Sequence, residues 1–252
     1  MGISDDGRYN SKDLEVPLIE IEKYIRHIRA DNVLELASGH GANTLFLAKR
    51  NPNVHFFAMD LSTRPKKKFS ELDNTSFQIG DFHDLTKYDK NSIDLVFIIE
   101  ALCHASDKGK VLKEVARVIK KGGIFIVLDG YYSSPISDLS PDEQKVCALT
   151  SAGMVVGEFM YLENFHSLIE SSGFDIIEET DLSEKVLPTM ERFGRLARVF
   201  FRLGIIAKLL QRISPNMFIR NSISGLLMPL LIKDGIAKYY RHVLIKDRDD
   251  PT

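Results

Sequence analysis

The chain has 252 residues and a formal net charge of −2, and it is 44% hydrophobic and 27% charged. This composition predicts an ordinary globular domain with an elaboration, and it excludes a disordered chain. Two cysteines, Cys103 and Cys147, are too few for a disulfide framework or a cysteine-ligated zinc site. The longest apolar stretch, residues 226–232, is far shorter than the ~20 residues of a membrane span. Residues 1–10 are polar and lack the basic and apolar regions of a secretory signal, so we expect a cytoplasmic protein.

Charge is unevenly distributed along the chain. Residues 192–246 contain 11 Lys and Arg and a single acid, Asp234, so this segment carries +10 and the remainder carries −12. Two interpretations stay open. Either the late segment contacts something anionic, such as a membrane surface, or it folds back on the acidic body.

The predicted elements alternate between strand and helix along most of the chain. Residues 8–28 indicate a loop and then a helix. Apolar runs rich in Val, Ile and Phe then predict strands at 32–37, 55–60, 75–80, 93–99, 123–129 and 174–181. Helices are predicted between them at 43–50, 62–72, 108–120 and 162–172, the third ending in two lysines and two glycines.

The late part of the chain departs from this alternation. Residues 187–213 read as a helix with one apolar face, and the arginines 195, 198 and 202 lie off that face. The apolar positions of the face are Leu196, Val199, Phe200, Leu203, Ala207 and Leu210. Residues 239–245 predict a last strand. We therefore expect an α/β fold with a doubly wound, mostly parallel seven-stranded, Rossmann-like sheet. A helical cap insertion at 182–237 would precede the last strand, within 238–247.

A run of small residues separates the first predicted strand from the next helix. Its backbone can pass close to a ligand, and glycine tolerates positive φ at two of its positions. These residues are Ala37, Ser38, Gly39 and Gly41. The helix that begins near Ala42 would offer free N–H groups to a carboxylate or a phosphate.

Acidic residues end the next two predicted strands. Asp60 can accept hydrogen bonds from both hydroxyls of a ribose, and Asp81 can accept one from the amino group of an adenine, with Phe82 nearby. The carboxyl ends of parallel strands meet at one edge of the sheet, where ligands bind in this type of fold. The sequence therefore predicts a nucleoside cofactor.

Two cofactor classes compete for this loop. A dinucleotide site requires Gly-x-Gly-x-x-Gly, and Thr44 stands where the third glycine would be. Glu35, inside the first strand, is unusual for such a site, whereas it can reach the amino group of a methionine-type tail. These features favour the second class.

The successive segments at this point resemble class I S-adenosylmethionine (SAM)-dependent methyltransferases. The similar parts are residues 33–44, Asp60, Gly80 with Asp81, residues 93–96 and residues 112–123, within roughly residues 15–180. The resemblance implies that Glu35 and the loop 37–41 hold the methionine end. It also implies that Asp60 binds the ribose and that Asp81 faces the adenine. Leu61 and Phe82, next to these acids, are further candidates for contact with the cofactor. One departure is Ala37, where the family usually has its first glycine.

The resemblance also assigns the parts of the chain. Residues 1–30 would form an N-terminal helical cover, and residues 31–181 would form the cofactor-binding core. Tyr9 would either reach the active site from the cover or be an ordinary surface tyrosine. Independently of the resemblance, Tyr131 and Tyr132 follow the fifth predicted strand at the ligand-binding edge of the sheet, and they and His166 are candidates to line the pocket of the methyl acceptor.

The segment after the fourth predicted strand is expected to hold the chemistry. Residues 99–105 are similar to sterol C-methyltransferases and to related lipid, quinone and natural-product enzymes. Glu100 would hydrogen-bond the cofactor or stabilise a developing cation, and His104 would accept a proton. The alternatives are that Glu100 caps a turn and that His104 is structural. No metal is implied, because no group of His, Asp and Glu has ligand spacing in the sequence.

The expected function is methyl transfer from SAM to a hydrophobic or amphipathic small molecule, with S-adenosylhomocysteine as the product. Nucleic acid is not expected, because the aromatic residues do not interleave with the basic ones as stacking requires. Two alternatives stay open, a small-amine or small polar N-methyltransferase and a non-catalytic SAM- or nucleotide-binding protein; a dehydrogenase is more distant. Neither the acceptor atom nor the oligomeric state follows from the sequence.

Overall fold

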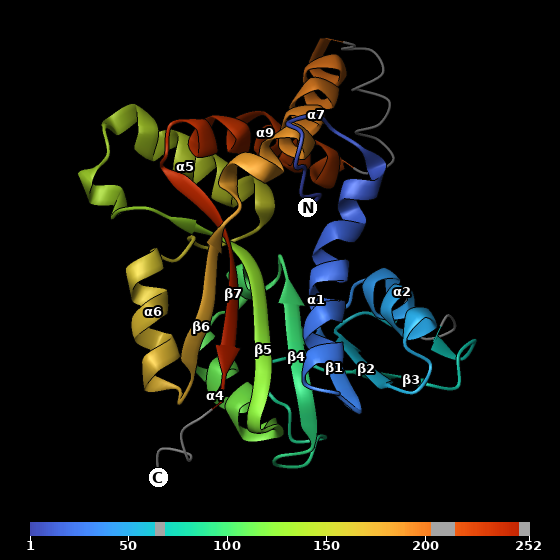
Figure 1. Ribbon diagram of the computed structural model, residues 1–252. Helices are drawn as coiled ribbons and strands as arrows, with labels where there is room; N and C mark the ends of the chain where they lie inside the picture. The colour runs from blue at the N-terminus through green and yellow to red at the C-terminus, as the bar shows by residue number, and fades with distance from the viewer. Residues whose placement is uncertain (64–68, 203–214, 247–252) are drawn as a thin grey trace. The chain divides into compact units, whose positions relative to one another are not determined.

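The computed structural model describes residues 1–63, 69–202 and 215–246 of the chain. Its centre is one seven-stranded sheet with the order β3-β2-β1-β4-β5-β7-β6 (Figure 1). The strands are β1 (Asn32–Leu36), β2 (His55–Asp60), β3 (Thr75–Ile79), β4 (Ile93–Ile99), β5 (Ile119–Tyr132), β6 (Asp175–Asp181) and β7 (Ala237–Ile245). The strand order reverses between β1 and β4, and this switch point is where ligands bind in doubly wound folds.

Strand directions confirm a mostly parallel sheet. The pairs β1–β2, β1–β4, β2–β3 and β4–β5 are all parallel. The last strand runs the other way. Lys246 N donates to Gly123 O at 3.0 Å, whereas Ser133 N, later in β5, donates to Ile236 O at 3.0 Å, before β7. As residue numbers increase along β5, those of the paired residues in β7 decrease, so β5 and β7 are antiparallel.

Helices connect and cover the strands. They are α1 (Val16–His27), α2 (Ala42–Arg50), α4 (Lys108–Val118), α5 (Pro141–Met154), α6 (Leu162–Ser171), α7 (Ser183–Arg202) and α9 (Pro215–Lys233). Short 3-10 turns form η1 (Ser11–Glu15), η2 (Leu102–His104) and η3 (Ile136–Asp138). None of the helices in the described parts of the chain is both long and apolar enough to cross a membrane.

Two helices of the structure differ from the prediction. The helix predicted at 108–120 ends at Val118, because Ile119 already pairs with Ile93 of β4. Lys120 then forms an ion pair with Asp94 at 2.6 Å, so the two lysines and two glycines belong to a strand and not to a helix end. The helix α5 was not predicted, although Ser140 and Glu143 form a capping box at its start. Residues 64–68 of the helix predicted at 62–72, and residues 203–213 of the helix predicted at 187–213, lie outside the described residues.

The chain divides into two compact units. One comprises residues 15–129, 164–180 and 241–252, and it contains β1 to β4, α1, α2, α4 and most of β5. The other comprises residues 1–14, 130–163 and 181–240, and it contains α5, α7 and α9. Strands β1 and β4 are buried almost throughout, which is what a strand covered on both faces requires.

The packed face of α7 differs from the apolar face that the sequence suggests. Its buried residues include Val186, Met190, Gly194 and Ala197, whereas Leu196 and Val199 are 54% and 52% exposed. Gly194 permits close packing, because a Cβ there would come within 3.0 Å of the Gly225 carbonyl oxygen in α9. Small residues therefore make the helix contact, and the bulky apolar residues face outward with Arg195 and Arg198.

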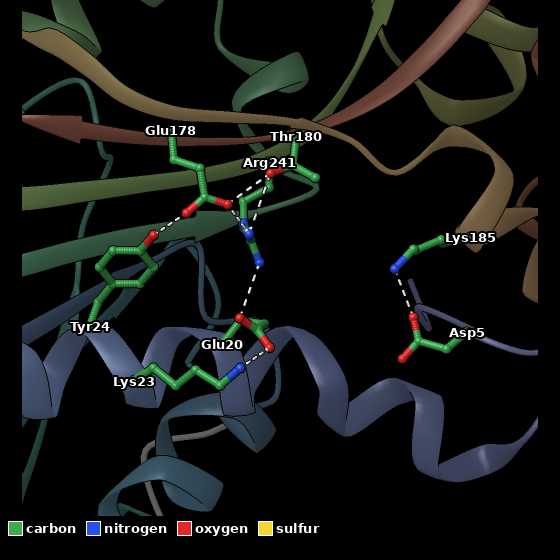
Figure 2. A network of polar contacts seen from close by, with 8 residues as sticks. All are labelled: Asp5, Glu20, Lys23, Tyr24, Glu178, Thr180, Lys185 and Arg241. Carbon is green, nitrogen blue, oxygen red and sulfur yellow. Dashed lines mark hydrogen bonds and ion pairs between the residues drawn. The ribbon is translucent and has the colours of Figure 1, made fainter.

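A polar network joins the edge of the sheet to α1 (Figure 2). Arg241 of β7 donates to Glu178 of β6, and its Nη1 lies 3.4 Å from a carboxylate oxygen of Glu20 in α1. The hydroxyl of Tyr24, also in α1, donates to Glu178 as well. The Arg241 side chain is only 12% exposed, so its charge needs both carboxylates.

Candidate cofactor and active site

The loop between β1 and α2 has an unusual backbone. Ala37, Gly39 and Gly41 all have positive φ, at 54°, 55° and 75°. A Cβ at Gly41 would lie 2.5 Å from the ring of Phe69, so any other residue would have to displace that ring and adopt a strained positive φ. A Cβ at Gly39 would meet nothing within 4 Å. The loop is thus tightly packed at Gly41 and open beside Gly39, where a ligand can approach the backbone.

Ala37 departs from the family pattern at a position where the structure shows why glycine is usual. Its φ of 54° lies in the left-handed region, which an L-residue with a Cβ adopts at a cost of about 1–2 kcal/mol. The loop nonetheless closes, with Ser38 N donating to Met59 O at 2.9 Å and Gly41 N to Ser38 O at 2.8 Å. Alanine therefore retains the conformation of the loop and strains it.

Glu35 is fully buried beneath the loop and binds the start of α2. Its Oε1 accepts from Asn43 Nδ2 at 2.9 Å, and its Oε2 accepts from Thr44 N at 3.0 Å and from the Thr44 hydroxyl. Burial raises the pKa of Glu35 to about 7, and the hydrogen bonds from Thr44 and Asn43 oppose that rise. The residue thus links β1 to the N-terminus of α2, and Asn43 and Thr44 are partners that the sequence did not reveal.

Asp60 ends β2 and lies directly against the glycine loop. Its Oδ2 accepts from Gly39 N at 2.8 Å, and its Oδ1 accepts from Ser62 N at 2.8 Å. Each oxygen keeps a lone pair for a ligand. The neighbouring Leu61 is 73% exposed. The structure therefore brings together Asp60 and the loop, which are about 20 residues apart in the sequence.

Asp81 follows β3 and is held by a histidine that the sequence analysis did not select. Asp81 Oδ1 accepts from His83 N at 2.9 Å and lies 2.6 Å from His83 Nδ1, and these hydrogen bonds lower the pKa of Asp81. His83 Nε2 accepts from Asp107 N at 3.4 Å, which places the ring proton on Nδ1. Phe82 lies beside the histidine, with ring centroids 4.9 Å apart.

The segment after β4 is also strained and braced. Glu100 has φ 54°, and its backbone N–H donates to Leu128 O at 2.8 Å. Strained non-glycine residues often mark functional sites. His104 is exposed at the end of η2.

Two residues missed by the sequence analysis hold this segment in place. Buried Asp129 accepts from Cys103 N at 2.8 Å, and Lys108 Nζ donates to the carbonyls of Cys103 and Ala105 at 3.3 and 3.0 Å. Burial lowers the pKa of Lys108 and raises that of the Cys103 thiol.

Other predicted site residues lie in different surroundings. Tyr9 belongs to the unit that contains α7, where its hydroxyl accepts from Arg192 Nη1 at 3.1 Å. Tyr131 and Tyr132 are buried in that same unit, and the hydroxyl oxygen of Tyr132 lies 3.0 Å from Ser151 Oγ. His166 is in the other unit and contacts Glu179. Their roles at a methyl-transfer site stay predictions.

Comparisons with known proteins place the central part of the chain in a family. A family model described as a methyltransferase domain matches residues 34–127. Methyltransferase GfsG of Streptomyces halstedii is 27% identical over 164 residues, covering 62% of this chain and 57% of that protein. Ajmaline N-methyltransferase of Rauvolfia serpentina is 26% identical over 218 residues, covering 82% and 73%. A sterol 24-C-methyltransferase of Kluyveromyces lactis is 30% identical over 109 residues, covering 43% and 29%.

Solved structures show the same fold at low sequence identity. The [4+2]-cyclase SpnF is similar with a TM-score of 0.76 at 16% identity, covering 98% of this chain and 88% of that one. A geranyl diphosphate C-methyltransferase of Streptomyces coelicolor has a TM-score of 0.69 at 14% identity, covering 97% and 90%. This chain spans 57% of GfsG and 29% of the K. lactis sterol enzyme, so the match to them is to a domain. Residues 34–127 thus match a methyltransferase domain, and this match and the named methyltransferase relatives support a SAM-dependent methyltransferase.

Proposed function

We propose that this protein transfers a methyl group from SAM to a hydrophobic or amphipathic small molecule. The observation that carries the proposal is the hydrogen bond from Gly39 N to Asp60. It joins the glycine loop to the acid that we expect to bind the ribose, near the switch point of the sheet. Relatives named for sterol and ajmaline methylation support the acceptor class. The same names differ in the atom that is methylated, carbon in one and nitrogen in the other, so the proposal leaves that atom open.

The residues present fit this cofactor. Ser38 Oγ is buried and has no hydrogen-bond partner among the described residues, so it is available to a ligand. The space beside Gly39 is open to the methionine end, and Asp60 retains lone pairs for two ribose hydroxyls. Glu35 would act mainly by fixing the start of α2, since both its oxygens already accept hydrogen bonds from that helix.

Bound SAM supplies an activated methyl group on a sulfonium. Transfer of this group to an acceptor would leave S-adenosylhomocysteine, with the electron pair of the S–CH3 bond on sulfur. The main contribution of the protein is therefore proximity and alignment. Asp129 and Lys108 would serve by holding residues 102–105, and Glu100 and His104 would stabilise charge or accept a proton there.

The deciding experiment is calorimetric titration with SAM, S-adenosylhomocysteine and NAD. Binding of the two sulfur compounds but not NAD is expected, and Asp60→Ala should weaken SAM binding at least about tenfold. Asp89→Ala, an exposed acid between β3 and β4, is the matched control. Unchanged affinity in Asp60→Ala would remove the ribose assignment.

Turnover separates an enzyme from a protein that only binds the cofactor. The [4+2]-cyclase SpnF has the same fold, so the fold by itself does not establish methyl transfer. A screen of isoprenoid, sterol, quinone and small-amine acceptors with methyl-labelled SAM tests it. His104→Ala should slow methyl transfer without changing SAM affinity; normal turnover would exclude His104 from the mechanism.

The outward face of α7 supports peripheral contact with anionic lipid as part of this proposal. Phe193, Leu196 and Val199 are 45–54% exposed, and Arg195 and Arg198 are exposed between them. A hollow of about 200 Å³ between α7 and α9 is lined by both arginines and by apolar residues of α9. Apolar side chains with flanking cations are typical of helices that bind anionic membranes.

Flotation with vesicles tests this contact. Vesicles containing an anionic lipid should recover the wild-type protein at low salt, and recovery should fall in the double variant Arg195→Gln/Arg198→Gln. Lys49→Gln, an exposed cation on α2, is the control. Equal recovery of the double variant and wild type would refute the membrane contact and leave the interpretation that the basic segment packs on the acidic body of the protein.

A further inference from the structure

Three potential metal ligands meet at the edge of the sheet, although they are far apart in the sequence. His166 lies in α6, Glu179 in β6 and His242 in β7, all within the same compact unit. Glu179 Oε2 lies 2.5 Å from His166 Nε2 and 3.0 Å from His242 Nε2, and the three ligand atoms lie within 4.8 Å of one another. None of the contacts described for the glycine loop, Asp60, Asp81 or residues 100–108 involves this His166–Glu179–His242 cluster.

The pairing of β6 and β7 explains how the cluster forms. Thr180 contacts Arg241 and Glu179 contacts His242, so neighbouring residues of the two strands face each other in antiparallel register. Successive side chains of a strand point to opposite faces. Arg241 therefore points to the face covered by α1, as Figure 2 shows, and His242 points to the other face, where His166 of α6 reaches it.

Burial holds one ligand rigidly and leaves the others accessible. The side chain of His242 is fully buried, and buried Phe165 packs edge-on against its ring at 5.0 Å between centroids. The side chains of His166 and Glu179 are 38% and 31% exposed. A cation can therefore enter from the solvent side and complete its coordination with water.

We propose that His166, Glu179 and His242 bind a divalent transition-metal ion of the Zn²⁺ or Co²⁺ type. Two imidazole nitrogens and one carboxylate oxygen form a donor set that binds such borderline ions in preference to Mg²⁺ or Ca²⁺, which favour oxygen ligands. Ligand atoms around a tetrahedral zinc lie about 3.3 Å apart, given bonds of about 2.0–2.1 Å. The two separations from Glu179 Oε2 are 2.5 and 3.0 Å, and no pair of the three ligand atoms is more than 4.8 Å apart. The partly exposed side chains of His166 and Glu179 would adjust around the ion. The bound ion would clamp α6, β6 and β7 together.

The test is metal titration of the intact protein after removal of metals with EDTA. We expect one equivalent of Zn²⁺ to bind and to raise the melting temperature, and Co²⁺ to give a visible d–d absorption band at the same stoichiometry. His166→Ala and Glu179→Gln should each weaken Zn²⁺ affinity at least about tenfold, as loss of one of three protein ligands predicts. His27→Ala, an exposed histidine of α1, should bind as wild type does.

Each other outcome is decisive. Absence of Zn²⁺ binding and of the Co²⁺ band in wild type would overturn the proposal and leave the cluster as hydrogen bonds only. An unchanged Co²⁺ band in His166→Ala and Glu179→Gln would also overturn it, because the ion would then lie elsewhere. Circular dichroism of the metal-free variants separates loss of the site from loss of the fold, and Glu179→Gln keeps the shape of the side chain. SAM affinity should be the same with and without metal, so this result does not depend on the proposed function.

Discussion

Replacement of Ala37 by glycine should stabilise the protein. Ala37 has φ 54°, and an L-residue pays about 1–2 kcal/mol in that region, whereas glycine adopts it freely. The greater freedom of glycine in the unfolded chain offsets about 0.5–1 kcal/mol of this gain. The free energy of unfolding should therefore rise by about 0.5–1 kcal/mol, which corresponds to roughly 1–4 °C in melting temperature for a chain of this size.

Urea unfolding followed by circular dichroism measures this change. Ala48→Gly is the matched control, because Ala48 is a buried residue inside α2, where glycine should cost about 1–2 kcal/mol. Val155→Gly is a second positive case, since Val155 has φ 59° and is 66% exposed at the end of α5. If Ala37→Gly destabilised the protein as much as Ala48→Gly does, the strain assigned to the loop would be refuted.

Three further predictions concern buried charges. The pKa of Glu35 is raised from 4.5 to about 7, so the folded state keeps a proton that the unfolded state loses between these values. Stability should fall by about 3 kcal/mol as pH rises through that window, and Glu35→Gln should flatten the dependence in urea melts at several pH values; an equal slope in both proteins would argue against it. Arg241→Met leaves the carboxylates of Glu178 and Glu20 without their shared cation and should cost about 2–3 kcal/mol, whereas exposed Lys145→Met should cost less than about 0.5. Lys108→Met removes the donor to two loop carbonyls and should lower stability by about 1–3 kcal/mol; a neutral effect would mean that water replaces it.

The sequence by itself determined the architecture of the chain. Alternating strand and helix periodicities, set by local backbone geometry, predicted the mostly parallel seven-stranded sheet, and all seven strands lie where expected to within a few residues. The spacing of the small-residue loop, Asp60 and Asp81 indicated the family, which the methyltransferase domain at residues 34–127 confirms. These features are local, or follow from strands that end at the same edge of a sheet.

Only the tertiary structure decided how distant residues meet. The end of α4 depended on pairing between Ile119 and Ile93, and the buried face of α7 depended on small residues that fit against α9. Sequence spacing excluded a local metal motif, yet His166, Glu179 and His242 come together because two antiparallel strands and a helix meet at the sheet edge. Such contacts arise from chain topology and from burial, and neither leaves a periodic signal in the sequence.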